Sequence, residues 1–297
     1  MAACCCASVY RSRLSELDAA KEPRVNPFRL AEKSSSMGCW REAALAALVL
    51  LPLALLFTRE PLPQDPLYHL LADDRTLFGV PNFFNVASNI AFLLAAIPGL
   101  AACFSSRRGG AWRSWAVFFA GTALVSLGSG YYHWAPGNGT LAWDRLPMAL
   151  AFMALLVAVL SEHLEERLER LLLAPALAMG IASVAWWHYA DDLRLYLWVQ
   201  FAPLVAVLFV LSVFPGRYGR RACLLYGLAF YGLAKIAELH DREIYELTSQ
   251  ALSGHVLKHL LAAFGALFVA WMLSKRAPLP VPGPARSREL DSLKRTA

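Results

Sequence analysis

The sequence predicts an all-α, polytopic membrane protein. Of its 297 residues, 58% are hydrophobic, and the mean hydropathy is +0.44. A soluble domain of this size usually has about 45–50% apolar residues. The apolar residues also gather into runs of about 17–25 residues, the length that an α-helix needs to cross about 30 Å of hydrocarbon. Together these observations exclude a soluble globular domain.

Eight such runs follow one another along the chain. The first is the shortest. The fifth contains Pro175 and Gly180, which a membrane helix tolerates when neighbouring helices satisfy the freed backbone groups. The runs extend over residues 43–58, 83–103, 114–135, 143–161, 172–190, 195–214, 222–240 and 255–273.

The distribution of charge predicts the orientation of these spans. The net charge is +6, which by itself would suit a nucleic-acid partner. If the loops alternate with the amino terminus inside, most of the 28 lysines and arginines fall on the inner side, whereas acids are frequent in the outer loops. This is the positive-inside pattern of membrane proteins. We therefore expect both termini in the cytoplasm, a lipid bilayer around the helices and no nucleic-acid partner.

Both ends of the chain are predicted to be disordered. Residues 1–36 are polar and lack periodicity, and the consecutive cysteines at positions 4–6 fit a disordered tail better than a lipidation site. Met37 is a candidate start, followed by an uncleaved anchor. We therefore divide the chain into a tail (1–36), an anchor helix with an outer loop (37–72), a helical core (73–274) and a cytoplasmic tail rich in proline and charge (275–297).

Three histidines and an aspartate are predicted to lie at one membrane depth, near the non-cytoplasmic face. His133 ends the third span, Asp144 begins the fourth, and His255 and His259 occupy the first two turns of the eighth. The i, i+4 spacing places the last two imidazoles on one helix face. Ionisable groups inside hydrocarbon are costly and usually functional. Because three histidines and a carboxylate suit a catalytic zinc, the three histidines are candidate metal ligands.

Other polar residues have simpler interpretations. Ser129 lies one helical turn before His133 and suits either packing or catalysis. We expect structural roles for His69, His163 and His188, whereas His240 is expected to reach toward the outer surface.

The second and seventh spans carry further polar groups. Lys235 and Glu238 are spaced i, i+3 and are expected to pair, whereas Asp241 is expected to reach toward the outer surface. The second span opens with several amides and a serine, for which we expect hydrogen bonds between helices: Asn82, Asn85, Ser88 and Asn89.

These motifs together resemble the alkaline ceramidase family. The resemblance lies in S-x-x-x-H at Ser129–His133, Asp144 eleven residues later, H-x-x-x-H at His255–His259, and NFFNVASNIAF at the start of the second span. The similarity covers about residues 73–274 and is strongest to bacterial-type members. The family is part of a superfamily of seven-helix membrane hydrolases that includes the adiponectin and progestin receptors.

The resemblance implies a seven-helix core bundle, with the first span as one extra N-terminal transmembrane helix. It implies Zn²⁺ held by His133, His255 and His259, and catalytic roles for two further residues. Asp144 would orient or deprotonate the attacking water, and Ser129 would lie near the developing oxyanion. The implied substrate is ceramide, a membrane lipid, cleaved at its amide to a sphingoid base and a fatty acid.

One departure from the family concerns calcium. Eukaryotic alkaline ceramidases have an acidic calcium site before the first core helix, with a glutamate where this chain has Asn82. Upstream, this chain offers only Asp73 and Asp74. A requirement for Ca²⁺ is therefore doubtful.

Three alternatives remain open from the sequence. The first is another lipid hydrolase of the same superfamily, a phospholipase or a different amidase. The second is a receptor-like seven-helix protein with structural zinc, which would have no need for both Asp144 and Ser129. The third is a transporter, against which the sequence shows no inverted repeat and no pair of broken helices.

Overall fold

The computed structural model describes residues 27–105 and 110–279, with side chains from residue 40 onward. The expected tails over residues 1–26 and 280–297, including the cysteines at 4–6, lie outside the described residues. The helices in chain order are α2 (Pro27–Phe57), η2 (Pro66–His69), α3 (Phe83–Ser88), α4 (Ile90–Ser105), α5 (Trp112–Trp134), α6 (Asn138–His163), α7 (Arg167–Ala190), α8 (Arg194–Val213), α9 (Ala222–Leu239), α10 (Asp241–Leu247) and α11 (Gly254–Lys275).

The all-α, multi-pass architecture predicted from the sequence is confirmed. Seven of the described helical segments are long and apolar enough to cross a membrane, namely Trp40–Phe57, Phe83–Ser105, Asn138–His163, Arg167–Ala190, Arg194–Val213, Ala222–Leu239 and Gly254–Lys275. They match seven of the eight predicted runs. The other run, 114–135, forms the 23-residue helix α5, whose glycines, serines and tyrosines make it more polar than its neighbours.

Two described boundaries differ from the predicted segments. The helix α2 begins at Pro27, earlier than the anchor expected from residue 37. The first residues of the predicted carboxy-terminal tail are also held in place, because Arg276 donates to Glu162 at 2.6 Å and Tyr218 forms a bridge with Pro278. The domain limits themselves remain predictions.

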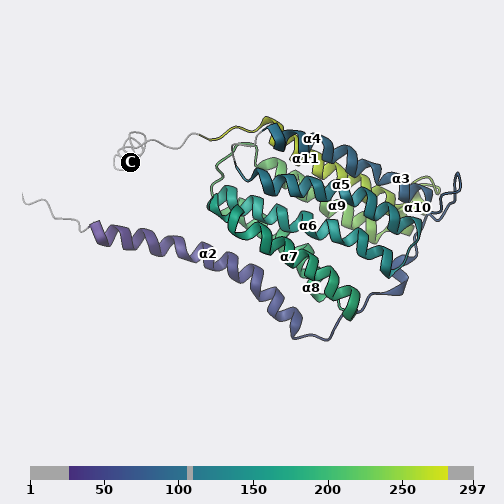
Figure 1. Cartoon of the computed structure of the whole chain (residues 1–297), viewed down its shortest axis with the longest axis horizontal. Helices are drawn as coiled ribbons and strands as arrows, with labels where there is room; N and C mark the ends of the chain where they lie inside the picture. The colour runs from purple at the N-terminus through teal and green to yellow at the C-terminus, as the bar shows by residue number, and fades with distance from the viewer. Residues whose placement is uncertain (1–26, 106–109, 280–297) are drawn as a thin grey trace, which may run out of the picture. The chain divides into compact units, whose positions relative to one another are not determined.

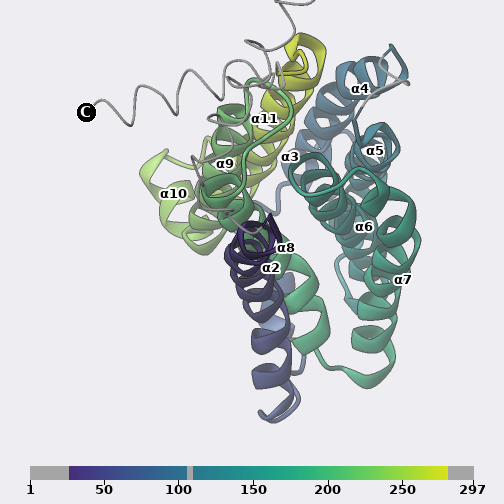
Figure 2. The same ribbon diagram turned by 90° about the vertical axis from the view of Figure 1, so that its left-hand side faces the viewer.

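The helices from α3 to α11 pack into one bundle. Helix α5 packs between α4 and α6. Helix α6 also packs on α7 and α8, and α11 packs on both α4 and α9. Figures 1 and 2 show α6 and α7 side by side in both views, with α9 beside α11. Buried aromatic and aliphatic side chains fill the interior, among them Trp115, Phe119, Trp187, Val199 and Val207.

Two glycines permit close contact between helices at the end of the bundle that holds His133 and His255, which we call the site end. A Cβ atom on Gly128 would lie 2.0 Å from the carbonyl oxygen of Trp143 on α6. A Cβ atom on Gly254 would lie 2.2 Å from the carbonyl oxygen of Ala237 on α9. Only glycine allows the backbones to approach this closely, so these positions fix how α5 meets α6 and how α11 meets α9.

An ion pair fixes the loop that precedes η2. Asp192 accepts hydrogen bonds from the Arg194 guanidinium, from the Trp186 indole at 3.0 Å and from the Leu62 amide at 3.3 Å. The Arg194 guanidinium lowers the pKa of this carboxyl well below its usual range. The pair therefore links the α7–α8 turn to the segment that carries Gln64 toward the site.

Candidate metal and catalytic site

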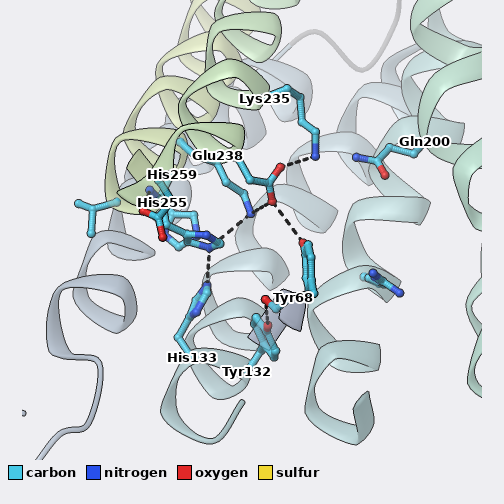
Figure 3. Close-up of polar contacts among 12 residues, drawn as sticks. Tyr68, Tyr132, His133, Gln200, Lys235, Glu238, His255 and His259 are labelled. Atoms are coloured by element: carbon cyan, nitrogen blue, oxygen red, sulfur yellow. Dashed lines mark hydrogen bonds and ion pairs between the residues drawn. The ribbon is translucent and has the colours of Figure 1, made fainter. Parts of the chain in front are cut away.

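The structure brings the three candidate histidine ligands together. His133 lies in the last turn of α5, and His255 and His259 lie in the first two turns of α11. One ring nitrogen from each lies within 4.8 Å of those of the other two, and all three side chains are buried. Figure 3 shows the rings of His255 and His259 above that of His133. Three buried histidines in this arrangement could hold a metal ion.

The spacing of the imidazoles fits a tetrahedral metal. The Nε2 atoms of His133 and His255 are 3.2 Å apart. Two nitrogens bound to one zinc at about 2.0–2.1 Å with tetrahedral geometry are separated by roughly 3.3 Å. The Nδ1 atom of His259 is hydrogen-bonded to the Ser88 hydroxyl at 2.8 Å, which leaves its Nε2 atom free to bind. An outer partner of this kind orients a metal-binding imidazole.

Side chains that accept hydrogen bonds from backbone amides fix the start of α11, the helix that carries His255 and His259. The Ser253 side chain accepts a hydrogen bond from the Val256 amide at 3.1 Å and so caps the start of α11. The Asp241 carboxylate accepts from the His255 amide at 2.7 Å and from the Ala72 amide at 2.9 Å. This half-buried carboxylate therefore binds amides of a helix terminus and a loop, and the expected direction of Asp241 toward the outer surface remains a prediction.

The two candidate catalytic residues lie side by side. Ser129 on α5 and Asp144 on α6 are both buried where the two helices are in contact. The contact depends on Gly128, the neighbour of Ser129, which lets α5 approach the backbone of α6 at Trp143. Ser129, Asp144 and His259 line the same cavity, so their side chains share one space.

A buried ionic network adjoins the histidines, and the sequence revealed only part of it. The predicted pair between Lys235 and Glu238 is present. Glu238 also pairs with Lys258 at 2.6 Å and accepts a hydrogen bond from the Tyr68 hydroxyl at 3.2 Å (Figure 3). Lys258 in turn lies 3.4 Å from Nε2 of His255. The i, i+3 spacing of His255 and Lys258 was the available signal for this contact.

The polar residues of the second span divide between two roles. Asn82 donates to the His133 carbonyl at 2.8 Å, and Asn85 donates to the Asp73 carbonyl at 2.7 Å. Asn89 bonds within its own helix, to the Asn85 carbonyl at 2.7 Å. Of these four residues, Ser88 is the one that bonds an imidazole ring of the cluster, and it therefore has a part in the site that the sequence interpretation did not give it.

The histidines assigned structural roles lie apart from the cluster. His69 bonds Tyr132 at 3.1 Å and Asn138 at 3.0 Å, and Nδ1 of His163 bonds the carbonyl of its own helix four residues earlier at 2.9 Å. His188 packs its ring against the flanking aromatic residues of α7. None of them belongs to the cluster formed by the described histidines.

The acidic residue upstream of the first core helix already has a cationic partner. The Asp73 carboxylate is 1% exposed and accepts two hydrogen bonds from the Arg75 guanidinium, at 2.8 and 2.6 Å. The same guanidinium lies over the Phe84 ring at 4.6 Å. These residues do not fit a calcium site, because the arginine occupies both oxygens that a calcium ion would need.

A cavity of about 450 Å³ extends from the site into the bundle. One end is polar and the other is apolar. The polar end is lined by Tyr68, Asp144, Arg145, Glu238, Lys258 and His259, and the apolar end by Phe118, Leu155, Val207, Leu228 and Val269. This gradient suits a ligand with a polar head and an alkyl chain.

The fold and this site define a multi-pass membrane protein with three buried histidines that could hold a metal ion between its helices. A family model described as Ceramidase matches residues 79–276, and the chain therefore belongs to the ceramidase family. It is accordingly a hydrolase that acts on the amide bond of ceramide. Comparisons with curated proteins and with solved structures give no match.

Proposed function

We propose that the protein is a zinc-dependent hydrolase that cleaves ceramide within the membrane to a sphingoid base and a free fatty acid. His133, His255 and His259 would hold the zinc. The observation that carries the proposal is the buried cluster of three imidazoles at the polar end of an otherwise apolar cavity. When bound, zinc would polarise the amide carbonyl and make water more acidic.

The chain's own residues supply proton transfer and orientation. Asp144 would accept a proton from the attacking water and deliver it to the leaving amine, as a general base and then a general acid. The Ser129 hydroxyl belongs to the lining of the cavity that Asp144 and His259 also line. With substrate present, the same hydroxyl can turn and donate to the developing oxyanion, a contact worth about 2.7–4 kcal/mol when well placed.

We further propose that the site lies near the non-cytoplasmic face, with both termini in the cytoplasm. The charge distribution of the loops supports this orientation. A site just below the interface suits a lipid whose chains remain in hydrocarbon while its head group stays at the surface. The apolar end of the cavity would then receive one alkyl chain.

The test uses purified full-length protein in detergent, assayed for zinc content and for fatty acid released from ceramide. His259→Ala should lose both metal and activity. Asp144→Asn should keep zinc but lose about 100-fold or more in turnover. His188→Ala, which removes an exposed histidine outside the cluster, is the matched control.

Three results would contradict the proposal. Absence of zinc from the wild type would remove the metal hypothesis. Zinc without fatty acid release would favour the receptor-like alternative, and release from phospholipid instead of ceramide would favour a phospholipase. Near-normal turnover by Asp144→Asn would show that the role given to Asp144 is wrong.

A further inference from the structure

Arg145 is a buried guanidinium held rigidly beside the cavity. It follows Asp144 on α6 and is only 6% exposed. Its Cζ atom lies 4.1 Å from the centre of the Trp187 ring and 4.8 Å from that of Tyr196. The Tyr68 ring is a third aromatic neighbour at 5.6 Å. Stacking on aromatic faces fixes the guanidinium in place without using its hydrogen-bond donors.

The donors of this guanidinium are only partly used. Its Nη2 atom donates to the Gln64 side chain at 2.7 Å. Its Nη1 atom is buried and has no hydrogen-bond partner among the described residues. No carboxylate of the described chain lies within ion-pair distance of Arg145. A buried donor of a charged group that lacks an acceptor is costly, so a ligand oxygen would stabilise it.

The charge balance at the polar end of the cavity favours an anionic ligand. Apart from one exposed acid, the ionisable side chains that line it are three basic residues, one buried acid and one half-buried acid, which gives a formal excess of one positive charge; they are Arg145, Lys235, Lys258, Asp144 and Glu238. Asp65 also lines the cavity, but it is exposed and therefore solvated. A divalent cation at the histidines would add to the positive excess. One negative group on a ligand would offset it.

We propose that Arg145 binds an oxyanion carried at the polar end of an alkyl chain. Two sources share this chemistry: the carboxylate of the fatty acid that the reaction releases, and a phosphate on the head group of a ceramide-like lipid. A planar guanidinium with a free N–H donor matches either group. The first source rests on the proposed ceramide hydrolysis, whereas binding itself requires no turnover.

The experiment measures equilibrium binding to full-length protein in a neutral detergent, with three C16 lipids as probes: palmitate, ceramide 1-phosphate and uncharged ceramide. Arg145→Gln removes the charge and Arg145→Lys keeps it while removing the planar donor array. Arg242→Gln is the matched control, because it removes an exposed positive charge in α10 that does not line the cavity. Zinc content and Tm of each variant report whether the fold and the metal site are retained.

Arg145→Gln should weaken binding of at least one anionic lipid by about 10- to 100-fold and leave uncharged ceramide within about threefold. Loss for palmitate alone assigns the product carboxylate, and loss for ceramide 1-phosphate alone assigns a phosphorylated head group. Loss for both supports a general oxyanion site. Unchanged binding of both anionic lipids, or an equal loss in Arg242→Gln, would overturn the proposal. An equal loss for uncharged ceramide would overturn it as well.

If Arg145→Gln does not fold, Arg145→Lys carries the test. It should bind the assigned anionic lipid at least about threefold more weakly than wild type while its affinity for ceramide is unchanged. Equal affinities would overturn the proposal. Arg145-dependent binding by a protein that releases no fatty acid from ceramide would support this inference and contradict the proposed function. Ceramide turnover together with lipid binding that does not depend on Arg145 would support the proposed function and contradict this inference.

Discussion

Replacing Gly128 by alanine should separate Asp144 from Ser129 and from the histidine cluster without altering any of these side chains. Gly128 lies on α5, directly before Ser129, at the point where α5 contacts α6. The new Cβ atom would lie 2.0 Å from the Trp143 carbonyl oxygen and 2.8 Å from its carbonyl carbon, whereas ordinary contact begins at 3.4 Å. The obstacle is backbone, which has no rotamer that relieves the clash.

The magnitude follows from this geometry. Relief of the clash requires the two helices to separate locally by about 1.4 Å, and overpacking of this kind typically costs about 1–3 kcal/mol. Asp144 directly follows Trp143 and would move with it. A displacement of about 1 Å at catalytic groups can lower the rate by about 100-fold. We therefore expect lower stability and a much larger loss of turnover, with zinc content retained because the histidines lie outside the clash.

Gly130→Ala is the matched control, since a Cβ atom at Gly130 meets no heavy atom within 4 Å. It should keep normal turnover, and its free energy of unfolding should rise by up to about 1 kcal/mol, because alanine is a better helix former than glycine. The assay compares Tm, zinc content and ceramide turnover of both variants in detergent. If Gly128→Ala behaves like Gly130→Ala, the close contact does not position Asp144, and the reasoning is refuted.

Three further predictions concern the surroundings of the site. Ser88→Ala should weaken zinc affinity by about 10- to 100-fold in competition with a chelator, because His259 loses the partner that orients it; unchanged affinity would contradict this. Asp192→Asn should lower the free energy of unfolding by about 2 kcal/mol at pH 7. The pKa of this carboxyl is depressed in the folded protein, so the difference in Tm between wild type and Asp192→Asn should shrink as the pH falls below about 4. A difference that stays constant with pH would refute this prediction. Adding calcium to calcium-free, zinc-loaded protein should change neither Tm nor turnover, because Arg75 already pairs with Asp73; a rise in either would show otherwise.

The spans and the histidine cluster could be predicted because their signals are local. Runs of apolar residues give each helix, and Pro136 and Gly137 mark the α5–α6 turn. The i, i+4 spacing of His255 and His259 fixes their shared face, and Ser253 marks the helix start. His133 is then expected at the same membrane depth as these two histidines, because the order of the spans places its helix end on the same side of the membrane. No contact between distant helices had to be known.

The supporting contacts could not be predicted because they depend on how helices rotate against one another. Lys258 reaches Glu238 only because α9 and α11 are neighbours, and Tyr68 reaches it because a loop folds over the site end. The role of Ser88 likewise depends on which face of α3 meets α11. The alternation of polar and apolar residues along one helix does not specify these pairings.

The most direct test of a zinc centre in the membrane is X-ray absorption spectroscopy at the zinc edge of the purified, full-length protein. The account predicts about one zinc per chain with three imidazole nitrogens at about 2.0–2.1 Å, and His133→Ala should lose one of them or the metal itself. Absence of zinc would contradict the account. So would a bound zinc whose ligands are unchanged in that variant.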